Sequence, residues 1–225
     1  MRRPLDGVCV LFDLDGTFVD TADDLAAAMN DALQSAGVAP VPAARVRGLI
    51  GHGARAMLAK GLAENGVANP APAYLDGLMT TFLRYYEAHI ADCSTVFPGA
   101  VEAADDLRRD GARIVICTNK RERLARRLIA ALNLESRFDL IVGPDTAGAA
   151  KPDPRPVHWC LEKTNANSGV FIGDSDTDIL AAEAASLPCL INEGGYGPLD
   201  EREKAFALLS DYAELAAHVR RAAKR

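Results

Sequence analysis

A short apolar run meets two carboxylates in the stretch VCVLFDLDGT, residues 8–17. Five consecutive apolar residues rich in β-formers predict a strand that is covered on both faces, as in a parallel sheet. Asp13 and Asp15 follow at once, and side chains at i and i+2 point the same way while the chain stays extended. Because ligand sites in open α/β sheets lie at the carboxyl ends of strands, both carboxylates are expected to face one small site.

Two carboxylates held that close repel each other unless a cation joins them. Mg²⁺ prefers oxygen ligands and commonly binds proteins through one or two carboxylates together with phosphate oxygens. Gly16 allows the chain to turn sharply beside such a site. An Asp-Gly pair is also the composition of an ordinary surface turn, so the metal hypothesis depends on partners elsewhere in the chain.

Other apolar runs resemble this first strand and alternate with helical patterns in the later part of the chain. The runs span residues 113–117, 138–142, 170–173 and 188–191, and the helical patterns span about 98–110, 121–133, 154–165 and 176–186. This alternation predicts an α/β fold with a doubly wound parallel sheet, which is a Rossmann-like core.

Residues 21–91 interrupt the alternation with apolar residues at helical spacing. Candidate helices there span 21–36, 42–49, 53–64 and 71–90. An all-helical block between the first strand and the rest of the sheet predicts an inserted small α-helical domain, and we assign residues 19–92 to it and residues 1–18 and 93–225 to the α/β core. Its own core is expected to contain the aromatic residues near helical spacing, Tyr74, Phe82, Tyr85 and Tyr86.

The chain is acidic, with a formal net charge of −6, and has the 49% hydrophobic and 25% charged residues of an ordinary globular protein. An acidic chain is a poor electrostatic match to nucleic acid or to an anionic membrane, so neither is expected as a partner. No stretch approaches ~18 uninterrupted apolar residues. The five cysteines include no Cys-x-x-Cys pair and several sit in apolar runs, which predicts buried thiols in a reduced, cytoplasmic, soluble protein.

Thr118 and Lys151 stand after further strands, in CTNK (117–120) and AAKPDP (149–154). The Thr118 hydroxyl and the backbone N–H groups at the start of a helix suit a phosphate oxygen. Lys151, in a loop stiffened by prolines, suits a fixed positive charge beside carboxylates or transferring phosphoryl oxygens. Taken alone, Thr118 and Asn119 also fit helix caps, and Lys151 fits a surface lysine.

Three acids in five residues follow another buried strand, in GDSDTD (173–178). Asp174 lies nearest the strand end and is the best candidate for a metal ligand, whereas Asp176 suits a helix cap and Asp178 suits an outer carboxylate that supports the site. Acid, hydroxyl, lysine and acid thus follow four strands of one predicted sheet, and this joint pattern is far more specific than any of its parts.

The order of these segments resembles the four motifs of the haloacid dehalogenase superfamily: DLDGT (13–17), CTN (117–119), KP (151–152) and GDSDTD (173–178). The resemblance covers the whole chain and places the helical insert where that superfamily has a helical cap. More narrowly, DGTFVDTADDL (15–25) and GLIGHGARAML (48–58) are similar to bacterial phosphoglycolate phosphatases.

The resemblance implies chemical roles for the matching residues. Asp13 would be the nucleophile that forms an aspartyl-phosphate. Asp15 would protonate the leaving alkoxide and then activate water as a base. Dehalogenases lack an acid at this position because a halide leaves without a proton, so Asp15 favours phosphoryl transfer. Thr118 and Lys151 would bind the phosphoryl group.

The resemblance also implies a metal site and further substrate contacts. Asp13, the backbone carbonyl of Asp15, and Asp174 would hold Mg²⁺, and Asp178 would support Lys151 or the metal shell. The remaining substrate-binding assignments are Gly16 and Asn119 in the core and Gly51, His52 and Gly53 in the insert.

The Gly-rich loop of the insert fits two interpretations. A Gly-rich helix start can hold an anion such as a substrate carboxylate, and an ordinary helix–helix turn fits residues 48–53 equally well. Arg45, Arg47 and Arg55 flank the loop and suit either the steering of an anionic substrate or simple solvation.

We therefore predict a Mg²⁺-dependent phosphatase that hydrolyses a small phosphorylated metabolite, with 2-phosphoglycolate as first choice. A phosphatase or phosphomutase acting on a sugar phosphate is the alternative within the same superfamily. A catalytically idle metabolite-binding module is the alternative from another class. Both a monomer and a homodimer are compatible with the sequence.

Overall fold

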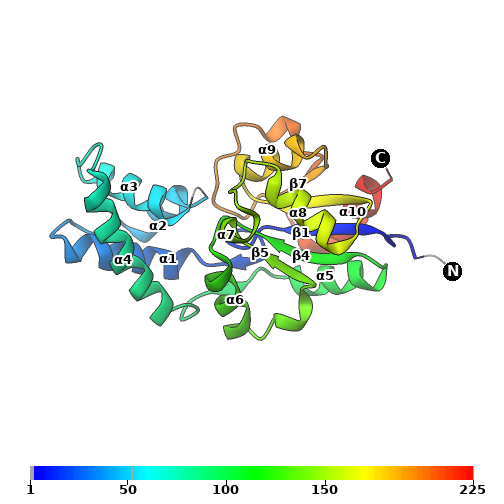
Figure 1. The fold of residues 1–225 in the computed structure, drawn as a ribbon, viewed down its shortest axis with the longest axis horizontal. Coiled ribbons are helices and arrows are strands. Elements are labelled where there is room, and N and C mark those ends of the chain that lie inside the picture. Colours follow the sequence, from blue (N-terminus) through cyan, green and yellow to red (C-terminus); the bar gives the residue numbers. More distant parts are fainter. Residues whose placement is uncertain (1–2, 52, 225) are drawn as a thin grey trace.

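The computed structural model describes residues 3–51 and 53–224, and Figure 1 shows a helical end joined to a larger end that contains a sheet. Within these residues a six-stranded sheet has the order β5-β4-β1-β6-β7-β8, and every neighbouring pair is parallel. The strands are β1 (Val8–Phe12), β4 (Arg113–Cys117), β5 (Leu140–Val142), β6 (Ser168–Gly173), β7 (Cys189–Asn192) and β8 (Ala207–Leu209). Strands are added on both sides of β1, so the predicted doubly wound parallel sheet is confirmed.

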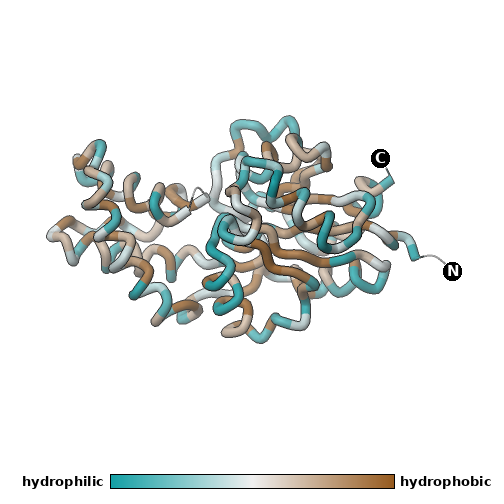
Figure 2. The backbone as a smooth tube through the Cα atoms, in the orientation of Figure 1, coloured by the Kyte–Doolittle hydropathy of each residue, from teal (hydrophilic) through white to brown (hydrophobic). Residues whose placement is uncertain are grey.

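Side chains of the central strand alternate between the two faces of the sheet, as a period of two residues requires. Val10 and Phe12 of β1 pack into the apolar cluster on one face, whereas Cys9 and Leu11 pack into the cluster on the other. Figure 2 shows the hydrophobic strands running through the middle of this end of the molecule. A strand that is apolar on both faces has to be covered from both sides, which is why its sequence shows no polar alternation.

Helices supply that cover. Helices α5 (Ala100–Arg109), α6 (Glu122–Ala131) and α10 (Leu215–Ala222) pack with Val10 and Phe12, and helices α8 (Arg155–Thr164) and α9 (Asp176–Ala184) pack with Cys9 and Leu11. Short elements complete this end: α7 (Pro144–Ala147), η2 (Glu135–Arg137), η3 (Arg202–Lys204) and η4 (Tyr212–Glu214). The buried thiols are confirmed for Cys9, Cys117, Cys160 and Cys189, whereas Cys93 is exposed.

The helical end consists of a block with its own apolar core. Its elements are α1 (Ala22–Ser35), α2 (Ala43–Val46), η1 (Arg47–Leu49), α3 (Ala54–Glu64) and α4 (Pro72–Ala88). Phe82 and Tyr86 are buried in this core and Tyr85 packs against it, as predicted. The prediction was wrong for Tyr74, which is 38% exposed near the start of α4. The exact division of the chain at residues 18 and 93 stays a prediction.

Two short strands join the block to the sheet-containing end, and the sequence pattern predicted neither of them. Strands β2 (Val19–Asp20) and β3 (Thr95–Val96) pair antiparallel. Beside them the buried Asp24 carboxylate accepts hydrogen bonds from the backbone N–H groups of Cys93 (3.0 Å) and Ser94 (2.8 Å) and from the Ser94 hydroxyl (2.6 Å). The two segments that connect the helical block to the sheet-containing end are therefore bound to each other and to the start of α1.

Two element boundaries differ from the sequence-based ones. The strand predicted at 138–142 begins only at Leu140, because the Asp139 carboxylate accepts the Ile114 N–H (2.8 Å) and ends the regular pairing there. The helix predicted at 42–49 is divided into α2 and η1, where Gly48 lowers the helical propensity.

Across the described ranges, none of the helices combines the length and hydropathy needed to cross a membrane.

Asp24→Ala is expected to lower the free energy of unfolding by about 2–3 kcal/mol, because it leaves two backbone N–H groups and a hydroxyl without their charged acceptor. Urea denaturation measures the change. Asp23→Ala is the matched control, since exposed Asp23 shares the first turn of α1 and its favourable position relative to the helix dipole. Equal losses in the two variants would show that the hydrogen bonds from Cys93 and Ser94 to Asp24 contribute nothing to the free energy of unfolding.

Candidate functional site

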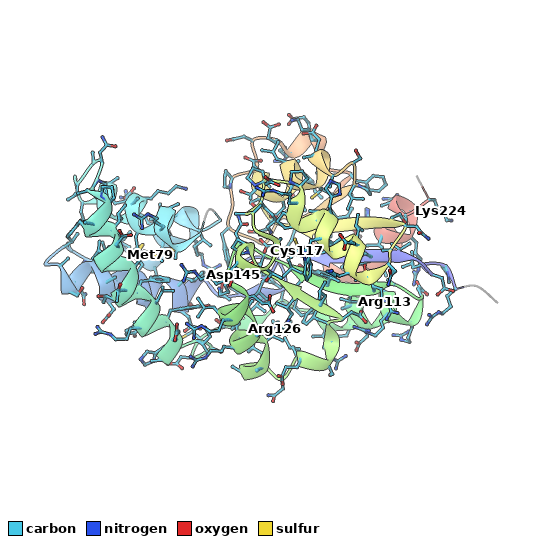
Figure 3. All side chains as sticks on the ribbon, viewed as in Figure 1. Met79, Arg113, Cys117, Arg126, Asp145 and Lys224 are labelled. Atoms are coloured by element: carbon cyan, nitrogen blue, oxygen red, sulfur yellow. The ribbon has the colours of Figure 1, made fainter. Side chains whose placement is uncertain are left out.

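A cavity of about 320 Å³ lies between the carboxyl ends of the central strands and the helical block. Its lining includes Asp13, Asp15 and Thr118 from the sheet side and Met79 and Tyr86 from α4. In Figure 3 the labels of Met79 and of Cys117, which precedes Thr118, mark these two sides. The predicted convergence of strand-end residues from far apart in the sequence is thus present in the fold.

Asp13 stands immediately after β1 at the centre of the site. Its backbone N–H donates to the Ile172 carbonyl (2.8 Å), which continues the pairing of β1 with β6 by one residue. Its Oδ1 accepts the Leu14 N–H (2.7 Å) and lies 3.0 Å from the Lys151 Nζ. Burial raises the pKa of Asp13 to about 6, although the neighbouring Lys151 ammonium opposes the rise.

Lys151 provides a buried positive charge between two carboxylates. Its Nζ lies 2.6 Å from Asp178 Oδ1 as well as 3.0 Å from Asp13, and its side chain is 1% exposed. Burial lowers the pKa of Lys151, but Asp13 and Asp178 outweigh this effect and hold it well above the usual range. Lys151 is therefore a permanent cation and not a surface lysine.

Asn119 fixes the loop that carries this lysine. Its Oδ1 accepts the Lys151 N–H (2.8 Å) and its Nδ2 donates to the Lys151 carbonyl (3.0 Å). Neither Thr118 nor Asn119 caps a helix, because α6 begins at Glu122 with Arg121 at its N-cap. Thr118 is 3% exposed at the pocket, and its Oγ1 accepts the Lys120 N–H (3.1 Å).

Asp174 stands after β6 and faces Asp13 across the site. Its Oδ1 accepts the Thr17 hydroxyl (2.9 Å), and its Oδ2 accepts the N–H groups of Tyr196 (2.8 Å) and Gly197 (3.3 Å). Burial, followed by the charges of Asp178 and Asp13, raises the pKa of Asp174 to about 8. The chain comes so close here that a Cβ on Gly16, whose φ is +83°, would clash with the Asp174 carboxylate.

Asp178 and Asp176 have structural partners of their own. Asp178 Oδ2 accepts the Ser175 hydroxyl (2.8 Å) and the N–H of Asp174 (3.1 Å), so Asp178 supports both Lys151 and the turn that carries Asp174. The proposed helix cap at Asp176 was wrong, because Ser175 is the N-cap of α9. The Asp176 carboxylate instead accepts backbone N–H groups of the loop at residues 200–201.

The acidic cluster fits a hard divalent cation. One carboxylate oxygen from each of Asp13, Asp174 and Asp178 lies within 4.8 Å of the others. The donors are all oxygens, and the raised pKa values of Asp13 and Asp174 show that the cluster favours an additional positive charge. Asp178 is fully buried, and its two oxygens hold the Lys151 ammonium and the turn at residues 174–175, so it suits a supporting role. Asp13, which lines the cavity, and Asp174, whose donors are all neutral groups, are the candidate ligands.

Lys120 is the functional candidate that the sequence-based prediction missed. Its Nζ lies 2.5 Å from Oδ1 and 2.7 Å from Oδ2 of Asp15, and its side chain is 6% exposed. Asp15 Oδ1 also accepts the Thr21 hydroxyl (2.7 Å). Burial lowers the pKa of Lys120, but Asp15 more than offsets it and holds the pKa above the usual range. The only signal in the sequence was a lysine in the CTNK segment, where a solvated lysine is equally common.

The insert loop reaches the cavity in part. Gly51 and Gly53 line it, and His52 lies outside the described residues. The arginines that flank the loop are engaged with carboxylates: Arg45 with Glu64, Arg47 with Asp20, and Arg55 with Asp76.

Comparison with known proteins gives consistent matches. A family model described as "haloacid dehalogenase-like hydrolase" matches residues 10–191. A phosphoglycolate phosphatase of Caulobacter vibrioides is 42% identical over 197 residues, covering 85% of this chain and 81% of that protein. A phosphoglycolate phosphatase of Mesorhizobium japonicum is 35% identical over 230 residues, covering 99% of each. A crystal structure described as a predicted phosphoglycolate phosphatase from Haemophilus somnus has a TM-score of 0.84 and 24% identity, covering 93% of this chain and 96% of that one, which shows a shared fold.

In EDTA at pH 8, Asp174→Asn is expected to raise the free energy of unfolding by about 1 kcal/mol or more. The raised pKa means that folded Asp174 keeps a proton that the unfolded chain gives up, so the stability of the wild type falls as pH rises from about 4 to about 8. Asparagine removes this loss and can still accept an N–H at one atom. Urea titrations between pH 5 and pH 8 measure how the free energy of unfolding changes with pH, with Asp176→Asn as the control. An unchanged pH slope in Asp174→Asn would contradict the raised pKa.

Proposed function

The chain belongs to the haloacid dehalogenase-like hydrolases and hydrolyses phosphoric monoesters; we propose that it uses Asp13 as nucleophile and that its substrate is 2-phosphoglycolate. Relatives named phosphoglycolate phosphatase, up to 42% identical, support this substrate. The products are then glycolate and phosphate.

The placement of the Asp13 carboxylate is the observation that carries the proposal. It lies at the open end of β1, faces the cavity, and is 14% exposed beside a lysine that is almost fully buried. A carboxylate is a weak nucleophile, so it needs a phosphorus atom whose negative oxygens are neutralised. We assign the binding of those oxygens to the Lys151 ammonium, 3.0 Å from Asp13, and to the Thr118 hydroxyl at the cavity, because phosphoryl transfer depends mainly on positioning and charge.

Asp13 and Asp174 would hold Mg²⁺, together with the backbone carbonyl of Asp15. When bound, the ion neutralises charge on the carboxylates and on the transferring phosphoryl group. Asp13 attacks phosphorus and forms an aspartyl-phosphate while the ester oxygen leaves. Lys151 and Thr118 keep the phosphoryl oxygens in place during this step and during the attack of water that returns Asp13 to its free form.

Asp15 would give the leaving alkoxide its proton and later accept one from the attacking water. Its carboxylate lines the cavity two residues beyond Asp13, on the side that α4 covers. The helical block encloses this space with Tyr86 and other apolar side chains, which would keep bulk water from the intermediate. We assign the block the part of a cap that limits the substrate to a small molecule.

With Mg²⁺ present, the protein is expected to release phosphate from 2-phosphoglycolate, and Asp13→Asn is expected to lower kcat by on the order of 10⁴. Malachite-green phosphate release measures both, and EDTA should abolish the activity until Mg²⁺ is restored. Asp23→Asn changes an exposed carboxylate and serves as the control. Near-normal turnover in a folded Asp13→Asn protein would remove Asp13 from the role of nucleophile.

Asp15→Asn is expected to slow the hydrolysis of 2-phosphoglycolate by about 10²-fold or more, and that of p-nitrophenyl phosphate far less. An alkoxide needs a proton to leave, whereas a nitrophenolate does not. The ratio of kcat/KM values for the two esters measures the effect. An equal loss on both would argue that Asp15 acts in some way other than proton donation.

A further inference from the structure

Lys120 is a buried cation whose only recorded carboxylate partner, among the residues that the structure describes, is Asp15. The ammonium contacts both oxygens of Asp15, at 2.5 and 2.7 Å, and lies 4.8 Å from the centre of the Tyr86 ring. A cation in such surroundings has lost most of its hydration. Its stability then depends on the carboxylate that faces it.

The residues around the Lys120–Asp15 pair supply few polar groups that could take the place of water. Leu25, Phe82 and Leu124 line the same cavity with apolar surface. Tyr86 also lines it, and its buried hydroxyl interacts with the Lys120 ammonium itself. An anionic oxygen placed beside Lys120 would therefore meet a buried ammonium in largely apolar surroundings, where an ion pair is strong and an unpaired charge is costly.

The proposed role of Asp15 conflicts with this arrangement as it stands. To reach the ester oxygen of a substrate, the Asp15 carboxylate must leave at least part of its contact with Lys120 and with the Thr21 hydroxyl. Removing one partner from a buried ion pair is strongly unfavourable because the other charge stays uncompensated. The exchange becomes feasible when another anion takes the place of Asp15.

We propose that Lys120 determines substrate specificity by binding the anionic group that the substrate carries next to its phosphate ester, in exchange for Asp15. This inference rests on the proposed function and deepens it. In 2-phosphoglycolate the carboxylate is joined to the ester oxygen through one carbon, so a substrate whose ester oxygen meets Asp15 would bring its carboxylate close to the Lys120 ammonium, which is held 2.5 and 2.7 Å from the two Asp15 oxygens. Substrates with such a group release the Asp15 side chain toward the ester oxygen, and esters with a neutral tail leave it bound to Lys120.

Other cations near the cavity are less suited to this exchange. Lys151 is held between Asp13 and Asp178, and Arg55 pairs with Asp76 while about half exposed. Arg121 lines the cavity but is exposed, so solvent screens its charge. Lys120 alone among these four combines burial with a partner that has to move during the reaction.

The test compares 2-phosphoglycolate with its neutral amide, 2-phosphoglycolamide, which has the same size and the same kind of ester. The quantity measured is the ratio of their kcat/KM values with Mg²⁺. The wild type is expected to favour the carboxylate strongly. Lys120→Met keeps an unbranched side chain of nearly the same length but removes its charge, and is expected to reduce this preference by about 10- to 100-fold.

Two variants separate binding at Lys120 from a general effect of charge. Arg121→Met removes the same charge one residue away and is expected to keep the preference. Lys120→Arg keeps the charge and is expected to retain part of the preference. Thermal melting establishes that each variant is folded; if Lys120→Met does not fold, Lys120→Arg and the wild-type comparison decide.

The inference is overturned if the wild type hydrolyses both compounds equally well, or if a folded Lys120→Met loses activity on both by the same factor. The second result would mean that Lys120 only positions Asp15. Activity on other phosphate esters with no preference for the carboxylate would leave the phosphatase function standing without the inference. Failure of the wild type to hydrolyse any phosphate ester would instead remove the proposed function, and the inference with it.

Discussion

The Lys151 ammonium is the charge on which the rest of the site depends. It lies between Asp13 and Asp178, whose carboxylates come within 4.8 Å of Asp174. Without a buried cation, the three carboxylates, two after strands and Asp178 in the first turn of α9, would repel one another in surroundings of low dielectric constant. Asn119 binds both the N–H and the carbonyl of Lys151, so the end of β4 fixes where this charge lies. The Asp13 carboxylate can stay partly open to the cavity because the lysine beside it is held this firmly.

One lysine does not fully compensate the cluster, and the remaining imbalance makes the site suitable for a metal. The pKa values of Asp13 and Asp174 stay raised, to about 6 and about 8, which means that the folded protein retains protons that the unfolded chain would give up. A divalent cation relieves the same imbalance without a proton. The close approach of Gly16 to Asp174 leaves no room for a side chain, so packing as well as charge confines the carboxylates to this small volume.

The helical block is connected to this cluster through a few polar side chains. The Tyr196 hydroxyl donates to Asp20 and accepts the Thr21 N–H, both at 2.7 Å, while the Tyr196 N–H donates to Asp174. Arg47 of the block binds the same Asp20 at 3.0 Å. The orientation of the block and the position of a proposed metal ligand therefore share one residue.

The sequence by itself determined five of the six strands of the main sheet, missing only β8, together with the doubly wound order of strand and helix, the all-helical insert, and the four segments whose side chains meet at the strand ends. These follow from hydrophobic periodicity and from residues within a few positions of one another, which a single chain displays directly. Only the tertiary structure decided which charges become partners: Lys120 pairs with Asp15 across 105 positions, Tyr196 binds Asp174 across 22, and Asn119 holds a backbone instead of capping a helix. It also left Tyr74 exposed and paired β2 with β3. A lysine has the same local pattern on a surface as in a buried ion pair, because burial depends on segments that fold against it from elsewhere in the chain.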